Sequence, residues 1–189
     1  GFFCREKGDG SLRGVFDGRK VNAQHGEPPP LEATTPATFS RLFCSPEKPL
    51  WITKSDIVSY FYELRAARWL VPWLGMPRVA VRALLRAGLS TAQVRNFCTD
   101  LRPGEALPEE VYPAWEAWPM GYLHSQAVAQ SCHLGVIYKE TDLTDAVFLS
   151  DSRPVPREAA QSFTVICDDF IGLSRQKEDA LRLDRQLTA

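Results

Sequence analysis

Two apolar, β-prone runs separated by a pair of acids make up FTVICDDFIGL, residues Phe163 to Leu173. Runs of this length and composition predict strands, and the polar pair between them predicts a hairpin turn. Adjacent carboxylates in a tight turn repel each other, so folding gains nothing from Asp168-Asp169 unless a cation or hydrogen-bond donors balance them. Divalent Mg²⁺ prefers such carboxylate oxygens, but acids are also common in solvated turns, so this pair alone is a weak signal.

A second apolar run that ends in an acid lies upstream, from Leu50 to Asp56. If its strand neighbours the hairpin in one sheet, Asp56 and Asp168 converge on two metal ions about 3.5–4 Å apart, the arrangement used for in-line phosphoryl transfer. The sequence has no Ser-His-Asp or Cys-His pattern and no phosphate-binding Gly-x-x-x-x-Gly-Lys loop that competes with this chemistry.

Turn and helix signals elsewhere predict short elements of both kinds. Glycines and Asp9 between two apolar runs predict a hairpin within residues 2–22. Thr35 or Thr38 is placed to cap a short helix that runs to Phe43. Apolar spacing predicts helices over 60–69 and 79–89, small residues predict one over 122–133, and leucines among charges predict an amphipathic helix over 177–187. Prolines predict connectors over 27–36 and 103–119.

Length and composition are those of an ordinary globular chain. The 189 residues are 44% hydrophobic and 24% charged, which predicts one domain with a sizeable core. No run of 18 or more apolar residues occurs, so no membrane span is expected. The chain opens with Gly-Phe-Phe-Cys rather than Met, so we expect an internal fragment of a longer protein.

The cysteine pattern predicts free thiols in a reduced, intracellular compartment. The cysteines are five in number, far apart and never in a Cys-x-x-Cys pair: Cys4, Cys44, Cys98, Cys132 and Cys167. The three histidines do not fall at zinc-ligand spacing from them or from each other.

The formal net charge of −1 argues against a polyanion ligand, but the charges are segregated along the chain. Between Leu64 and Asn96 every charged residue is an arginine: Arg65, Arg68, Arg78, Arg82, Arg86 and Arg95. Such a segment is compatible with a phosphate-facing surface. A solvated Arg-rich helix face without a ligand is an equal alternative on charge alone.

Four segments with characteristic acids, glycines and aromatics follow in order along the chain: KGDGSLRGVFDGRKVN (7–22), DIVSYFY (56–62), WPMGYLHS (118–125) and ICDD (166–169). The first is similar to the fingers hairpin of reverse transcriptases, and the second resembles their first palm motif, an Asp followed five residues on by an aromatic. The third is similar to the Pro-x-Gly-x-x-x-Ser motif and the fourth to the x-x-Asp-Asp turn. The chain therefore resembles reverse transcriptases of retroelement (retrotransposon) type.

The resemblance implies a magnesium-dependent nucleotidyltransferase site. Its catalytic, metal-binding carboxylates are Asp56, Asp168 and Asp169, and the carbonyl of Ile57 completes the ligand set. The implied cofactors are two Mg²⁺ ions, with Mn²⁺ as an alternative.

The resemblance also assigns substrate contacts. Arg13 and Lys7 would hold the nucleotide triphosphate, because a guanidinium suits phosphate oxygens. Phe61 would stack beneath the sugar and exclude a 2′-hydroxyl, while Met120 and Gly121 would lie under the template and incoming nucleotide. Without the motifs, Arg13 is equally well interpreted as a surface hairpin residue, and Phe61 as a core aromatic.

The chain departs from the family pattern at several positions. Ile166 stands where the family usually has an aromatic, and Met120 where many members have Gln. Asp17 and Arg19 are expected to form a structural pair rather than a catalytic one. The Arg-rich stretch over 65–115 is expected to be an elaborated fingers region or an insertion.

The implied fold is α+β: a polymerase palm with an antiparallel sheet and packed helices, plus a fingers subdomain, with the thumb absent. Fingers are expected at 1–50 and roughly 63–117, and palm at roughly 51–62 and 118–189. The implied function is RNA-directed DNA polymerase. Its expected partners are an RNA or DNA template-primer duplex, dNTPs and the remainder of a longer polyprotein with a thumb and any RNase H domain, but no membrane.

Three other functions are weighed against this one. The first alternative is a catalytically inactive, nucleic-acid-binding reverse transcriptase-like palm from a decayed retroelement. A two-metal nuclease has no motif support, and an RNA-directed RNA polymerase is disfavoured by Phe61.

Overall fold

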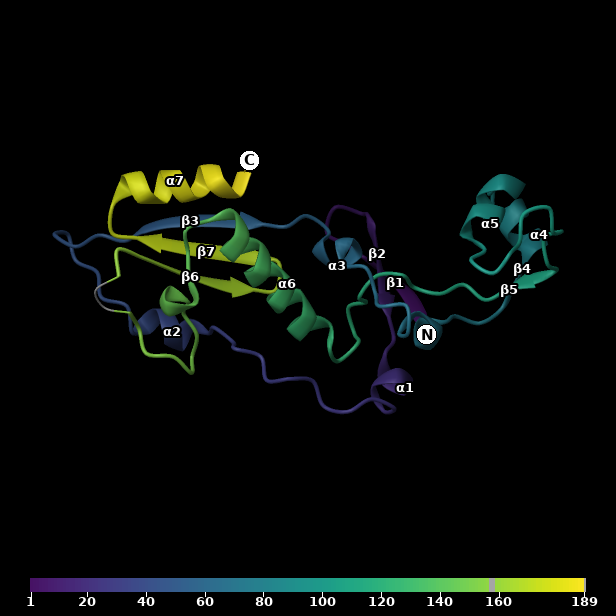
Figure 1. The fold of residues 1–189 in the computed structure, drawn as a ribbon, viewed down its shortest axis with the longest axis horizontal. Helices are drawn as coiled ribbons and strands as arrows, with labels where there is room; N and C mark the ends of the chain where they lie inside the picture. Colours follow the sequence, from purple (N-terminus) through teal and green to yellow (C-terminus); the bar gives the residue numbers. More distant parts are fainter. Residues whose placement is uncertain (157–158, 189) are drawn as a thin grey trace. The chain divides into compact units, whose positions relative to one another are not determined.

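The computed structural model describes residues 1–156 and 159–188, which form helices and antiparallel sheets (Figure 1). The chain divides into two compact units, each made of two separate segments. Unit 1 contains residues 1–25 and 65–122, and unit 2 contains residues 26–64 and 123–189. These boundaries differ from the expected fingers and palm limits, and the assignment of either unit to fingers or palm stays a prediction.

Unit 2 is built on an antiparallel sheet of three strands in the order β3-β7-β6. The strands are β3 (Trp51–Asp56), β6 (Gln161–Ile166) and β7 (Asp169–Ser174). The predicted hairpin and its neighbouring strand are therefore confirmed. One detail is wrong: only Asp168 lies in the two-residue turn, with Cys167, because Asp169 already pairs with Ile166 on one side and Asp56 on the other.

Two helices pack against one face of this sheet, α6 (Ser125–Glu140) and α7 (Lys177–Thr188). The buried cluster between them joins Phe163 and Phe170 of the sheet with Ile137 of α6 and Leu183 of α7. Successive strand residues alternate between faces, so Asp56 and Asp169 belong to the face opposite Phe170. The helices thus bury one side of the strands and leave the acids on the other.

Short elements complete unit 2. They are α2 (Pro36–Ser40), capped by the Thr35 hydroxyl, α3 (Tyr60–Glu63) and the 3₁₀ turn η2 (Asp145–Val147). The prediction of a helix over 60–69 is wrong beyond Glu63. The Ala66 amide donates instead to the Glu116 carbonyl, and a bridge pairs Arg65 with Ala117, so the backbone there follows an extended neighbour rather than a helix.

Unit 1 opens with the predicted hairpin of β1 (Phe2–Glu6) and β2 (Leu12–Phe16), which pair in antiparallel register. Its other elements are α1 (Arg19–Asn22), η1 (Val71–Leu74), β4 (Val79–Ala80), α4 (Val81–Arg86), α5 (Thr91–Phe97) and β5 (Glu110–Val111). The predicted 79–89 helix is shorter than expected because β4 pairs with β5 inside the predicted Pro-rich connector. Helix α5 was not predicted, although Ser90 and Gln93 form a capping box that is visible in the sequence.

All five cysteines are free thiols, as predicted. No helix in the described part of the chain combines the length and the apolar character that crossing a membrane requires.

Candidate functional site

The sheet of unit 2 brings the three predicted carboxylates to one end. Asp56 and Asp169 are Cα partners on adjacent antiparallel strands, which places their Cβ atoms about 4.5–5.5 Å apart on one face. Asp168 precedes Asp169 in the turn, and its carbonyl accepts a 3.2 Å hydrogen bond from the Ile57 amide. The strand end that carries Asp56 is therefore tied by its backbone to the turn that carries Asp168.

Lys54 adds a cation to these acids. Its Nζ lies 3.0 Å from Oδ1 of Asp169, across the strand pair and on the same face. The hydrogen bond and charge of Asp169 raise the pKa of Lys54, and the charges of Asp56 and Asp168 raise it further. The Lys54 ammonium group thus lies close enough to all three carboxylates for each charge to act on it.

The donor set suits a hard divalent cation in kind. Carboxylate oxygens with a backbone carbonyl, here that of Ile57, are what Mg²⁺ and Mn²⁺ accept. Nevertheless, no three His, Cys, Asp or Glu side chains among residues 1–156 and 159–188 are grouped closely enough to hold a metal ion. The backbone register and this side-chain placement point in different directions. Strand pairing fixes where the acids can reach, and rotation of these exposed or partly exposed side chains can still bring their carboxylates together.

The turn itself has an unusual backbone. Cys167 has φ of 56°, in the left-handed region that side chains other than glycine rarely adopt. Its carbonyl accepts a 2.9 Å hydrogen bond from Nδ1 of His133 on α6. Burial raises the pKa of the Cys167 thiol, and the charges of Asp168 and Asp169 raise it further, so this sulfur is a poor metal ligand at neutral pH.

Phe61 lies in α3 of unit 2, five residues after Asp56, and is half-buried. Its ring centroid is 6.2 Å from that of Tyr60, which is buried. A partly exposed ring at this position is available to a ligand, and its role as a steric gate stays a prediction.

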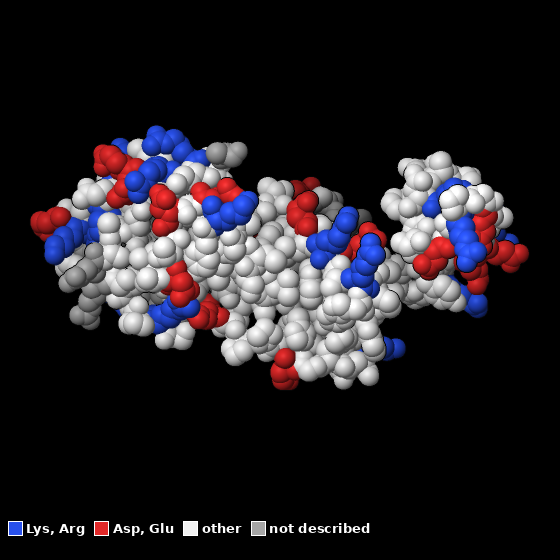
Figure 2. Space-filling view, viewed as in Figure 1, with Lys and Arg blue, Asp and Glu red and all other residues white. Residues whose placement is uncertain are grey.

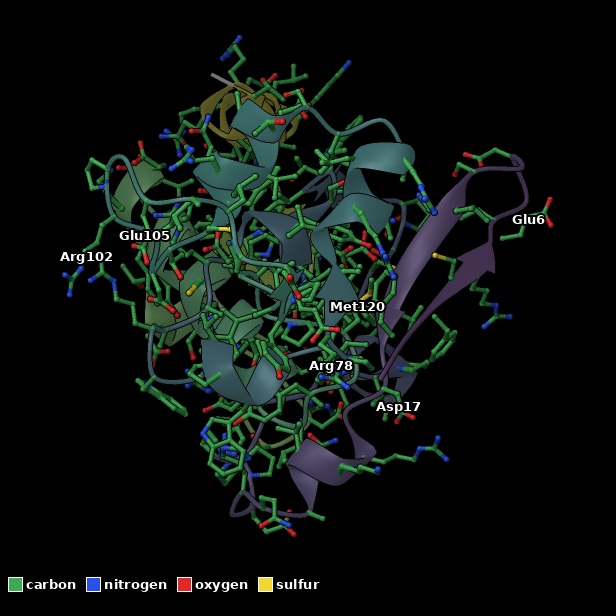
Figure 3. The ribbon with its side chains drawn as sticks, turned by 90° about the vertical axis from the view of Figure 1, so that its right-hand side faces the viewer. Glu6, Asp17, Arg78, Arg102, Glu105 and Met120 are labelled. Carbon is green, nitrogen blue, oxygen red and sulfur yellow. The ribbon has the colours of Figure 1, made fainter. Side chains whose placement is uncertain are left out.

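The predicted phosphate-binding residues lie on the hairpin of unit 1. Lys7 starts the turn, and its amide bonds to the Ser11 carbonyl, while Arg13 lies in β2 directly opposite Arg5 in β1. Both arginines are exposed, and neither forms an ion pair within the described residues. In Figure 3, Glu6 marks the outer end of this hairpin and Asp17 its other end. Like charges directly across a strand pair repel, so Arg5 and Arg13 form a pair that an anion would stabilise.

The Pro-x-Gly segment packs against the inner end of the same hairpin. Gly121 has φ of +104°, and a Cβ there would lie 2.4 Å from the Phe16 carbonyl oxygen. A Cβ on Gly18 would lie 2.3 Å from the Gly121 oxygen, which also accepts a 3.0 Å hydrogen bond from the Asn22 side chain. Only glycine permits this backbone contact, which places Met120 and Gly121 beside the end of β2.

Two charged features serve structure, at least in part. Arg19 makes hydrogen bonds to both carboxylate oxygens of Asp17, with Nη2–Oδ2 at 2.6 Å, and this lowers the pKa of Asp17, so the expected ion pair is present. Arg78, in the Arg-rich segment, pairs with Glu110 at 3.0 Å. Figure 2 shows acids beside the basic residues over the α4 and α5 region. The surface around the Arg-rich segment therefore carries both acids and bases, although the segment itself has only arginines as charged residues.

Three residues near these sites were not predicted. The position of Lys54, two residues before Asp56 in a strand, shows from the sequence that both share a face. Gly18 follows Asp17 in the 7–22 segment, and its position there is only a weak indication of the close backbone contact with Gly121. Nothing in the sequence indicated that His133 reaches the acidic turn, because that contact depends on how α6 packs.

Comparison with known proteins supports the fold. No family model and no curated protein matches the sequence. Among solved structures, the chain is similar to a foamy viral protease-reverse transcriptase, dRH, in complex with double-stranded DNA, with a TM-score of 0.58 and 13% sequence identity. The match covers 98% of this chain and 23% of that one, so the chain spans under a quarter of its neighbour. Units 1 and 2 thus have a reverse transcriptase-like fold.

Proposed function

We propose that this chain is the fingers-and-palm part of an RNA-directed DNA polymerase that adds deoxynucleotides to a primer 3′-hydroxyl. One observation carries the proposal: within a reverse transcriptase-like fold, Asp56 lies in register with Asp169 and next to the turn that holds Asp168. The similar foamy viral protein was solved with double-stranded DNA, which supports a template-primer duplex as the partner.

The carboxylates and one carbonyl of unit 2 would hold the cofactor. Asp56 and Asp168 would each bind both Mg²⁺ ions, with Asp169 alongside and the carbonyl of Ile57 as a further ligand. Two bound ions supply activation of the attacking 3′-hydroxyl and neutralisation of charge on the leaving pyrophosphate. The side chains have little covalent work to do, so the rate depends on how firmly they hold these oxygens in place.

Side chains outside the acidic end would select and orient the nucleotide. Arg13, with Lys7, binds the triphosphate, and Arg5 lies across the hairpin where it can share that charge. Phe61 stacks beneath the sugar, and Met120 with Gly121 lies under the template and incoming base.

The alternative, an inactive nucleic-acid-binding palm, has two observations in its favour. Lys54 already pairs with Asp169 at 3.0 Å, and no three-ligand cluster occurs among the described residues. A cation held this way can replace a metal in stabilising the acids while leaving no catalyst.

Magnesium-dependent primer extension on a poly(rA)/oligo(dT) duplex tests the proposal, using this chain and any longer protein that contains it. Asp168→Asn should reduce incorporation by about a thousandfold or more, because it removes a charge that both ions need. Asp184→Asn, on the exposed side of α7, is the matched control and should keep full activity. Extension that survives Asp168→Asn would reject the assigned site, and duplex binding without extension would support the inactive palm.

A further inference from the structure

His133 is a buried histidine that the proposed chemistry does not use. Its side chain is 3% exposed, and Nδ1 lies 2.9 Å from the carbonyl oxygen of Cys167. A carbonyl oxygen only accepts hydrogen bonds, so Nδ1 carries the proton and donates it. Burial lowers the pKa of His133, against the smaller opposing effects of the Cys167 carbonyl, Asp168 and Asp169, so the neutral ring is favoured.

The accepting carbonyl belongs to the peptide that joins Cys167 to Asp168. The next carbonyl, that of Asp168, accepts the 3.2 Å bond from the Ile57 amide. The two peptides that flank the Asp168 Cα are therefore held from different elements, one by α6 and the other by the end of β3. Holding both peptides restricts the direction in which the Asp168 carboxylate leaves the turn.

The turn needs such support because of its conformation. Cys167 has φ of 56°, which is disfavoured for a residue with a Cβ and persists only where the surroundings impose it. The backbone conformation of Cys167 sets the direction of its own carbonyl, and this is the carbonyl that His133 binds. Without that donor, more common turn conformations become accessible, and each would point Asp168 differently.

The imidazole is itself fixed in place. The ring of Tyr60 lies 5.6 Å from it, and the Tyr60 hydroxyl donates a 2.7 Å hydrogen bond to the Ala129 carbonyl on the preceding turn of α6. Tyr60 is buried and starts α3, four residues after Asp56. Tyr60 and His133 thus connect α6 both to the segment that follows Asp56 and to the turn that carries Asp168.

We propose that His133 is a positioning residue for Asp168, whose Nδ1–H holds the Cys167–Asp168 peptide and so sets the direction of the carboxylate. This inference rests on the proposed function, since it gives Asp168 its role as a metal ligand.

The variants His133→Asn and His133→Leu separate hydrogen bonding from packing. An Asn amide nitrogen can reach the site of Nδ1 and donate, whereas Leu fills similar space without a donor. Mn²⁺ titration of this chain, followed by electron paramagnetic resonance, is expected to show affinity about tenfold weaker in His133→Leu and within about threefold of wild type in His133→Asn. Primer extension should fall about a hundredfold in His133→Leu and recover in His133→Asn.

Imidazole ¹⁵N spectra of the wild-type chain give a second readout that needs neither metal nor activity. They should show a neutral ring protonated at Nδ1. A ring protonated at Nε2, or equal Mn²⁺ affinity in wild type and a folded His133→Leu, would overturn the inference. Failure of the polymerase proposal is seen separately, as wild-type protein that binds duplex but does not extend a primer.

Discussion

The β6–β7 hairpin and the β1–β2 hairpin carry opposite charges in very different surroundings. In β6–β7, Phe163 and Phe170 are fully buried beneath α6 and α7, and β3 pairs along the outer side of β7. In β1–β2 every residue of the first strand is exposed, and no third strand from the described part of the chain joins it. The acids proposed to bind metal are thus held by packed backbone, whereas the cations proposed to bind phosphate lie on a two-stranded ribbon with an exposed first strand.

This difference follows from the side chains. A carboxylate is short, so its position depends on its backbone, and metal ligands tolerate only small displacements. Arginine and lysine side chains are long and flexible, so they can reach a phosphate even when their backbone is not precisely placed. We therefore expect the two hairpins to respond differently to the same kinds of change.

Core truncation should show the largest difference. Phe170→Ala should lower the free energy of unfolding by about 3–5 kcal/mol, because it empties a site that is 0% exposed. Phe3→Ala, at a ring that is 52% exposed on β1, should change it by under about 1 kcal/mol. Urea denaturation measures both. Equal losses would mean that the β1–β2 ribbon is packed as firmly as the sheet.

Removal of a guanidinium should affect binding rather than folding. Arg13→Ala is expected to weaken nucleotide binding about tenfold or more through loss of charge-assisted hydrogen bonds, with an unchanged melting temperature. Fluorescent dNTP titration measures the affinity. Arg185→Ala, at an exposed arginine of α7, serves as the control, and an equal loss there would indicate a general charge effect.

Acid should destabilise the β6–β7 region through His133. Its pKa is lowered by burial in the folded chain, so the unfolded chain binds the extra proton first as pH falls below about 6.5. The contribution of neutral His133 to the free energy of unfolding is therefore present above about pH 6.5 and is lost as the pH falls below it. His133→Asn should therefore show a flatter fall in urea midpoint between about pH 7 and pH 5. An unchanged slope would assign the acid sensitivity to other groups.

The smallest expected effect concerns Lys54. Lys54→Met frees Asp169 and removes a positive charge, so Mn²⁺ should bind this chain about two- to fivefold more tightly, in line with the weakness of exposed ion pairs. Isothermal titration calorimetry measures the change, with Lys139→Met, at an exposed lysine of α6, as the control. Weaker Mn²⁺ binding in Lys54→Met would show that the ammonium supports the acidic site rather than competing for it.

Local signals gave correct predictions where neighbours along the chain control the backbone. The two β-prone runs around Asp168-Asp169 predicted the hairpin, Thr35 was the correct one of two candidate caps, and the apolar run to Asp56 predicted the neighbouring strand. Predictions were wrong where distant segments pair, as at Ala66, whose amide bonds to Glu116 instead of continuing a helix.

The amino-acid order alone therefore specified the two hairpins, their charges and the identity of the three acids, because turn formation and strand period depend on adjacent residues. Tertiary structure decided the strand order that pairs Asp56 with Asp169, the ion pair of Lys54 and the contact from His133 to the turn. Each of these joins elements far apart in sequence, and their approach is determined by how buried side chains such as Phe170 pack.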